Sequence, residues 1–336
     1  SVPQKSKTRT KNGVPSQDSG KYSGAFLYVT NTRGRLSKRA YADVDGKISI
    51  DGATRLTHGT ARRIKIHADP RKAAKNLADN FNVMACEHAV VLGDLVQPHN
   101  EVKIVTKSEL LKHTDSDVLI ISRSKDYITY HAKQPAWALF DIDAKNLRAD
   151  LPLEDVFEAL CSVIPELKNA ARVVRTSSSS GITTPKTGKK FDSGGLHIFV
   201  LVEDGAEIDR ATLAFDKHLW LAGFVKIVFS ANGAPLIRSP IDTAVRSPER
   251  LVCAGAVECV APIIVDPNAG LAVAAGSKLL DTTNAISNLN DGDMVEYKRL
   301  GKVAKNVAQP ESEKKREDYI SKRAGALANA SGVSQT

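Results

Sequence analysis

A hydrophobic run that ends in two acids, Trp137–Asp143, constrains the fold more than any other stretch of this sequence. In a β-strand successive side chains alternate between faces, so Asp141 and Asp143 project on one side while Phe140 and Ile142 enter a packed layer. Neighbouring carboxylates repel each other unless a cation lies between them, and hard divalent cations such as Mg²⁺ prefer oxygen ligands. The run therefore predicts a buried strand with a cation site at its end. The alternative is a strand that ends in a solvated acidic turn.

Composition limits the class of protein. The chain has 336 residues, of which 42% are hydrophobic, enough for one large domain or two ordinary ones. No apolar segment approaches the length of a bilayer span, so we expect no membrane partner. Four cysteines in a chain of this length do not indicate a disulfide framework, and we expect a reducing, cytoplasmic location. The net charge of +9 favours an anionic partner such as nucleic acid or a nucleotide.

Hydrophobic periodicity predicts a chain of mixed α+β class. Alternating or continuous short apolar runs predict strands at 25–30, 47–50, 62–67, 102–106, 118–122, 137–143, 171–175, 196–202 and 225–229. Longer amphipathic segments predict helices at 70–81, 152–169, 207–222 and 311–327. Asp69-Pro70 is a favourable cap and first-turn pair, and Thr106-x-x-Glu109 has the pattern of a capping box.

The chain divides into four segments. Residues 1–22 form a flexible basic tail, because they contain almost no large apolar residue. Residues 23–105 form an N-terminal α/β portion and a candidate template-binding surface, 106–300 form the core that carries the motifs below, and 301–336 form a charged helix and tail. The candidate template-binding surface is Arg55, Arg62, Arg63, Lys65, Arg71, Lys72 and Lys75. The alternative for these cations is an ordinary solvated face.

Three separated features carry groups suited to chemistry on a phosphorylated ligand. The acids Asp141 and Asp143 come first, and a Ser/Gly turn that includes Ser177, Ser178, Ser179 and Ser180 follows. His197 then stands at the start of an apolar strand after Ser193-Gly194-Gly195, and Asp242 follows a further apolar segment. Carboxylates hold divalent ions, and Ser/Gly loops offer hydroxyl and N–H groups to phosphates. Together these parts suit a triphosphate bound to metal ions.

These features resemble a known family. Phe140-Asp141-Ile142-Asp143, Ser193-Gly194-Gly195-Leu196-His197 and Ile241-Asp242 are similar, in order and spacing, to the three motifs of the archaeo-eukaryotic primase superfamily. The resemblance covers about residues 135–255 and is closest to the primase-polymerases of plasmids and phages. It implies an α/β unit and an RRM-like unit on either side of a central cleft. The N-terminal hundred residues carry no matching motif, and a lysine-bearing insertion separates the Ser-rich turn from His197.

The resemblance also implies roles for individual residues. Asp141, Asp143 and Asp242 would hold two Mg²⁺ or Mn²⁺ ions, and His197 with Ser177–Ser180 would bind the incoming NTP or dNTP. Arg238, Arg246 and Arg250 are candidate phosphate or template contacts, because a guanidinium group offers a planar fork to phosphate oxygens. The implied activity is primase or DNA polymerase activity on single-stranded DNA, in the cytoplasm of a bacterial, archaeal or phage-infected cell. The resemblance also implies a replicative helicase as a partner, fused or separate. Because the chain has no P-loop, we expect either a separate helicase or one on a longer polypeptide, as the missing initiator Met before Ser1 also suggests.

Two other functions fit parts of the pattern. A metal-dependent nuclease also gathers carboxylates around two ions, and Asp141-x-Asp143-x-Lys145 allows it, but the Ser/Gly turn and His197 would then have no role. A replication-initiation protein that binds DNA without catalysis would need none of the acids.

A zinc site formed by Cys86, His88, Cys253 and Cys259 is a further alternative, although their spacing fits no tight ligand pattern. The remaining cysteine, Cys161, lies on an apolar helical stripe and is expected in the core.

Overall fold

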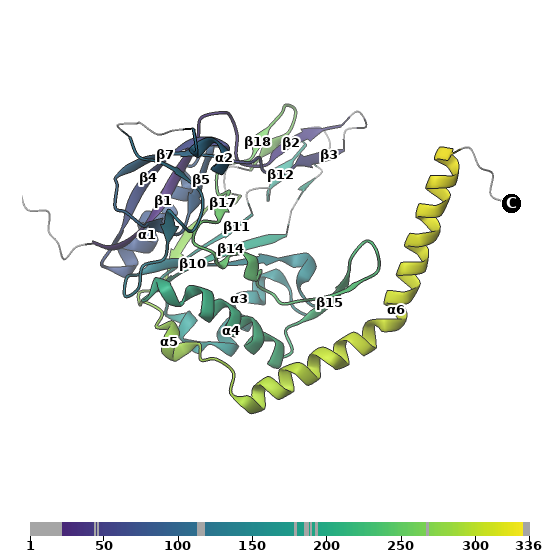
Figure 1. Cartoon of the computed structure of the whole chain (residues 1–336). Helices are drawn as coiled ribbons and strands as arrows, with labels where there is room; N and C mark the ends of the chain where they lie inside the picture. Colours follow the sequence, from purple (N-terminus) through teal and green to yellow (C-terminus); the bar gives the residue numbers. More distant parts are fainter. Residues whose placement is uncertain are drawn as a thin grey trace, which may run out of the picture.

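The structure is a computed structural model that describes residues 22–331 apart from 44, 46, 113–117, 178–179, 185–187, 189, 192–193 and 267–268. The predicted basic tail lies outside the described residues except for Tyr22. The chain is of mixed α+β class, as the sequence predicts, and two larger sheets organise it (Figure 1).

The first sheet has six strands and is built mainly from the N-terminal part of the chain. Its order is β17 (Leu251–Val252), β5 (His88–Val91), β1 (Tyr22–Asn31), β4 (His58–His67), β7 (Glu101–Val105) and β8 (Ile120–Ser122). β7 and β8 run parallel and are joined through the short helix α2 (Lys107–Leu110), whereas the other pairs are antiparallel. Because β17 comes from far along the chain, it brings the segment after Asp242 against the N-terminal sheet.

The second sheet has four antiparallel strands and carries the motif residues. Its order is β10 (Ala136–Asp143), β14 (Gly195–Val202), β11 (Arg172–Thr176) and β20 (Val273–Ala275). The strand predicted to be central, β14, lies between β10 and β11. On the free side of β10, Ile142 makes an isolated antiparallel bridge with Ile241.

Each face of the second sheet packs against a different layer. Phe140, Ile142 and Ile198 pack with α3 (Val156–Val163) and α4 (Ile208–Leu221), which cover one face. Trp137 and Phe199 point to the other face and pack with α1 (Pro70–Asn82) and with β1 and β5 of the first sheet. Figure 1 shows the second sheet between these two layers. The alternation predicted for β10 therefore places Asp141 and Asp143 on the face that looks toward the first sheet.

The other strands form small sheets around these two. One contains β2 (Arg39–Ala42), β3 (Ile48–Asp51) and β18 (Glu258–Cys259), and another contains β12 (Ile182–Thr183), β13 (Lys190–Phe191) and β19 (Ile264–Val265). The remaining two are the hairpin β15 (Lys226–Phe229) with β16 (Pro235–Arg238) and the pair β6 (Asp94–Leu95) with β9 (Ile128–Thr129).

Two helix predictions need correction. The helix expected at 152–169 is broken into the 3-10 turn η2 (Leu153–Asp155), α3 and the 3-10 turn η3 (Pro165–Lys168). Proline at 165 cannot donate to the preceding turn, so α3 ends before it. The helix expected at 311–327 is part of a much longer one, α6 (Asp291–Ser331), in which Pro310 is internal. Capping at Asp69 and Thr106 is as predicted, but α2 has only four residues.

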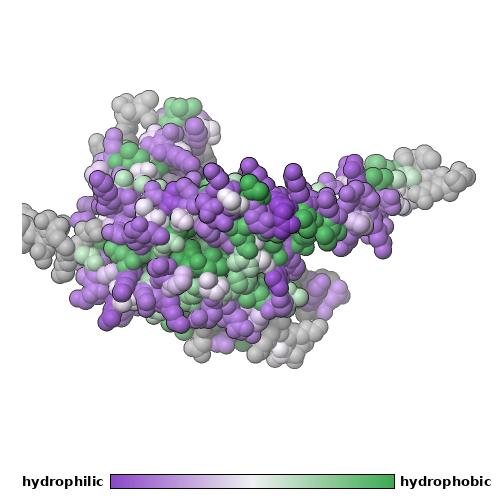
Figure 2. Space-filling model, turned by 90° about the horizontal axis from the view of Figure 1, so that it is seen from below, coloured by the Kyte–Doolittle hydropathy of each residue, from purple (hydrophilic) through white to green (hydrophobic). Residues whose placement is uncertain are grey.

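Helix α6 runs along α4 and the β15–β16 hairpin and then extends away from the body of the molecule (Figures 1 and 2). Trp220 of α4 stacks against Tyr297 with ring centroids 5.0 Å apart, and Ser312 Oγ donates to Gly233 O in the hairpin turn (2.8 Å). The projecting part is mostly hydrophilic in Figure 2. Among the described helices, none combines the length and the apolar character that crossing a membrane requires.

Candidate active site

The pairing of β10 with β14 brings the first two motifs together. Asp141 lies directly opposite His197, and Asp143 lies opposite Gly195. Residues opposite one another in an antiparallel pair project from the same face, so Asp141 and His197 are neighbours there. His197 Nε2 is 3.3 Å from Asp141 Oδ1. His197 Nδ1 is buried and has no hydrogen-bond partner among the described residues.

The third motif reaches the same strand through the main chain. Asp242 N donates to Asp141 O (2.9 Å), beside the bridge between Ile142 and Ile241. Both isoleucines are buried in the core formed with α3 and α4. Asp242 therefore lies opposite Asp141 and projects from the acidic face, where Cβ atoms of opposite residues are about 4.5–5.5 Å apart. Its Oδ1 accepts from Ala244 N (2.9 Å) and caps the 3-10 turn η5 (Thr243–Arg246).

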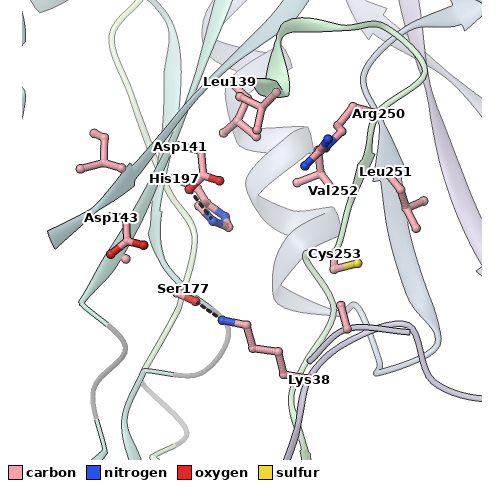
Figure 3. Close-up of a pocket in the computed structure, with 14 residues that line it drawn as sticks. Lys38, Leu139, Asp141, Asp143, Ser177, His197, Arg250, Leu251, Val252 and Cys253 are labelled. Atoms are coloured by element: carbon pink, nitrogen blue, oxygen red, sulfur yellow. Dashed lines mark hydrogen bonds and ion pairs between the residues drawn. The ribbon is translucent and has the colours of Figure 1, made fainter. Parts of the chain in front are cut away.

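A cavity of about 430 Å³ opens beside Asp141, Asp143 and His197. Figure 3 shows the acids and His197 on one wall, and Arg250 with the chain through Cys253 on the other. Lys38 closes one end, where its Nζ donates to Ser177 Oγ (3.3 Å). The lining is completed by Ala53, Leu139, Ile142, Gly195, Val245, Leu251 and Val252. The cavity thus combines carboxylates, two cations and a hydroxyl from four distant parts of the chain.

The pKa of Asp141 shows how these charges act together. Burial alone would raise the pKa of its carboxyl, but the hydrogen bond from His197 and the positive charges of His197, Lys38 and Arg250 outweigh burial. The pKa is therefore below its ordinary value of 3.8. Because the folded-state pKa is depressed, the stability that Asp141 contributes is complete above the unfolded-state pKa and is lost as pH falls through the folded-state value.

Replacing His197 by Ala is expected to raise the pKa of Asp141. The substitution removes both the hydrogen bond and the nearest positive charge, whereas the burial that opposes ionisation stays. Titration of the Asp141 carboxyl carbon by NMR in wild type and in His197→Ala measures the change. An unchanged or lower pKa would show that His197 does not hold this carboxylate.

The acids match a hard divalent cation in ligand type, and all three lie on one face of the sheet. In the structure each has another partner: Asp143 forms an ion pair with Lys145 and accepts from Lys145 N (3.2 Å), while Asp141 faces His197 and Asp242 caps η5. Among the described residues no three His, Cys, Asp or Glu side chains are gathered closely enough to hold an ion. Ion binding would therefore require Asp143 and Asp242 to exchange these partners for the metal.

The predicted phosphate contacts fall into three groups. Ser177 and Arg250 line the cavity, whereas Ser178 and Ser179 lie outside the described residues. Ser180 is buried and donates its N–H to Ser177 O (2.9 Å), but it does not line the cavity. Arg238 also lies elsewhere, since it is exposed on β16 opposite Lys226. Arg246 forms an ion pair with Asp209 (2.8 Å) and does not line the cavity. The serine turn and the three arginines are thus only partly brought to the acids.

One cation that lines the cavity, Lys38, carries no signal in the sequence. It lies just before β2 of the small sheet with β3 and β18, and only the tertiary structure brings it to Ser177. The segment Leu251–Cys253 reaches the cavity for a similar reason, because β17 pairs with β5. No local pattern distinguishes these residues from other polar or apolar ones.

The zinc alternative gains no support from the described residues. All four cysteines are free, and no group with three possible metal ligands contains them. His88 Nδ1 accepts from Ala85 N (3.0 Å), which is a local structural contact. Cys161 of α3 is buried in the hydrophobic core between α3 and the second sheet, as its position on the apolar stripe predicts.

The chain was compared with protein-family models, curated proteins and solved structures. No family model, no curated protein and no solved structure matches it, so membership of the primase superfamily stays a prediction from the three motifs.

Proposed function

We propose that the chain is a metal-dependent nucleotidyltransferase of the archaeo-eukaryotic primase type, which joins nucleotides on a single-stranded DNA template. The observation that carries the proposal is the cavity in which Asp141, Asp143 and His197 face Lys38, Ser177 and Arg250. Acids alone suit many metal sites, but acids opposed by cations suit a ligand that brings both metal ions and negative phosphates. A cavity of about 430 Å³ is also within the usual range for small-molecule sites.

The order of elements around the site supports the same proposal. Along the chain β10, α3, β11, β14 and α4 are followed by the segment at Ile241, which bridges to β10. The spatial order is Ile241, β10, β14, β11 and the additional edge strand β20, with both helices on one face. Without β20 and the inserted strands β12, β13, β15 and β16, this order is that of a β-α-β-β-α-β ferredoxin-like unit, which supports the RRM-like unit of the proposal. The first sheet would be the second unit that flanks the cleft.

The chain's own residues would bind and orient the nucleotide. Lys38, Ser177 and Arg250 would contact the phosphate chain, since their donors line the wall opposite Asp143 or the end of the cavity. His197 would position Asp141 and keep it ionised. Mg²⁺ or Mn²⁺ held by Asp141, Asp143 and Asp242 would activate the attacking 3′-hydroxyl and stabilise charge on the leaving pyrophosphate.

The test is strand synthesis on a single-stranded DNA template with Mg²⁺ or Mn²⁺ and labelled nucleotides. Reactions with and without a primer separate extension from priming, and NTP and dNTP arms define the substrate. Incorporation that depends on template sequence supports the proposal. Absence of incorporation in all arms, with a folded protein that retains DNA binding, would favour the non-catalytic alternative.

Replacing Lys38 by Ala is expected to raise the KM for nucleotide by about ten- to a hundredfold, the usual cost of losing a charge-assisted hydrogen bond. The matched control is Arg39→Ala. Arg39 is the next residue, but it pairs with Glu258 (3.3 Å) and does not line the cavity. Steady-state kinetics measure both variants, and equal effects would mean that the two cations act only through overall charge.

A nuclease is the second candidate, and the ion pair between Lys145 and Asp143 favours it, because this pair places a cation beside an acid of the proposed metal site. The same reactions distinguish the two functions when nucleotides are left out. Loss of a labelled single strand that requires Lys145 would support the nuclease, whereas elongation that requires Lys38 would support the polymerase.

A further inference from the structure

A second cavity of about 250 Å³ lies beside Ala256 and Val257, which follow β17. Its walls are mainly apolar and include Phe81 at the end of α1 and the chain after β19. Arg175, Asp266, Gly270 and Leu271 also line it. Arg250, Lys38 and the acids of the first cavity do not.

Arg175 is a buried cation in the wall of this cavity. It lies opposite His197 in the pairing of β11 with β14, so it continues the row of charged groups across the sheet. Only 6% of its surface is exposed. Its Nη1 donates to Ala254 O (2.6 Å), and its guanidinium group stacks over the ring of Phe81, 5.4 Å from the centroid. Its Nε is buried and has no hydrogen-bond partner among the described residues.

No acid among the described residues forms an ion pair with Arg175, although Asp266 also lines the cavity. Burial lowers the pKa of Arg175 to about 10, so the group stays charged at neutral pH in a site that disfavours charge. Such a group is costly in a protein unless a ligand or another residue neutralises it.

Gly270 lies beside the Nη2 atom of Arg175, near the Thr176 hydroxyl and Ser177 O. A Cβ atom added to Gly270 would lie 3.8 Å from Nη2, so the absence of a side chain there leaves room beside the guanidinium group. The Nε and Nη2 donors of an arginine lie on one edge of its planar fork and bind two oxygens of an oxyanion at once. In the structure Nε is covered, so an anion in the cavity would first meet Nη2 beside Gly270 and would reach Nε through a small rotation of the guanidinium group.

We propose that the cavity at Arg175 is a second ligand site, which binds a phosphate group either as the free ion or as part of a nucleotide. The phosphate accepts hydrogen bonds from Arg175, and the apolar walls at Phe81 and Leu271 leave space for a small organic part. This site is separate from the proposed polymerase site and does not depend on nucleotidyl transfer. A solely structural role, in which Arg175 only holds Ala254, is the alternative.

The test compares thermal unfolding of the full chain, without divalent cations, in inorganic phosphate, adenosine 5′-monophosphate, adenosine and acetate at matched ionic strength. Phosphate and the monophosphate are expected to raise the Tm, because a ligand that binds only the folded state stabilises it. Equal effects identify the free ion as sufficient, and a larger effect of the monophosphate identifies a nucleotide. Equal stabilisation by acetate, or none by either phosphate, would overturn the proposal.

The decisive variant is Arg175→Met, with Arg172→Met as its matched control. Arg172 is on the same strand, but its guanidinium group lies over Phe157 on the other face, 4.2 Å from the ring centroid. Arg175→Met should fold with a Tm near that of the wild type, since it removes a costly buried charge but also leaves Ala254 O without its donor. It should bind phosphate about ten- to a hundredfold more weakly. The assignment would be contradicted if Arg175→Met bound phosphate as well as the wild type, or if Arg172→Met lost as much binding. If Arg175→Met aggregates, Arg175→Lys is the second variant, and isothermal titration measures its phosphate binding.

Discussion

Asp141→Asn and Asp143→Asn are each expected to lower the rate of template-directed synthesis by more than about a hundredfold. Replacing a residue that only supports a metal ligand costs up to about a hundredfold, and replacing a ligand itself should cost more. Asparagine keeps the shape of the side chain but removes the negative charge that a divalent cation requires. Primer extension at saturating nucleotide measures the loss, and Mg²⁺-dependent change in Tm measures metal binding separately.

Both variants are expected to remain folded. Asp143 is partly exposed at the end of β10, and removal of one of two neighbouring acids relieves their repulsion. Asp150→Asn is the control. Asp150 is an exposed acid that pairs with Arg148, two residues before it, and it does not line the cavity. Synthesis at the wild-type rate in Asp141→Asn would remove the basis of the proposed function. Loss of DNA binding together with synthesis would point instead to a damaged fold.

Asp94→Ala is expected to destabilise the chain by about 3–5 kcal/mol, the usual cost of removing one partner of a buried ion pair. Asp94 is only 3% exposed and accepts from Arg63 at both oxygens, from Nε to Oδ1 (2.6 Å) and from Nη2 to Oδ2 (2.5 Å). It also accepts from Leu95 N (2.8 Å). Without the carboxylate, Arg63 would keep its charge but lose its partner, and the pair β6–β9 would lose an anchor to β4.

Chemical denaturation of Asp94→Ala measures this loss, and Asp79→Ala is the control. Asp79 is exposed and pairs with Lys75 one helical turn away, so its removal should change stability by less than about 1 kcal/mol. Equal effects of the two substitutions would show that the Arg63–Asp94 pair does not contribute as a buried pair. Double replacement of Arg63 and Asp94 by apolar residues should recover part of the stability.

The same pair changes the interpretation of the basic N-terminal segment. The sequence groups Arg63 with Arg62 and Lys65 as cations for template contact. In the structure Arg63 is committed to Asp94, and this hydrogen bond raises its pKa, so Arg63 is a structural residue. Arg62 lies over the ring of Tyr28, 5.6 Å from the centroid. A DNA-binding surface in this segment would have to use cations other than Arg63. The sequence alone does not distinguish a cation that forms a buried ion pair from one that is free to contact DNA.

Local patterns predicted much of the secondary structure because each depends on neighbouring residues. The alternation of Phe140 and Ile142 with Asp141 and Asp143 fixes the faces of β10, and Asp69 caps α1 through its own side chain. The predicted length of the helix at 152–169 was wrong because a single residue interrupts it. Proline at 165 ends α3 at Val163, and the chain continues as the separate 3-10 turn η3.

The sequence by itself determined the acidic face of β10, the apolar β14 that carries His197, and the chemical types at the candidate site. Only the tertiary structure decided which of these groups meet. Strand register sets Asp141 against His197, and a single bridge at Ile241 brings Asp242 beside Asp141. Lys38 comes from the small sheet that contains β2 and Arg250 from the segment before β17, while Arg238 stays outside. The physical reason is that register and sheet packing are set by contacts between residues far apart in the chain, which no local pattern records.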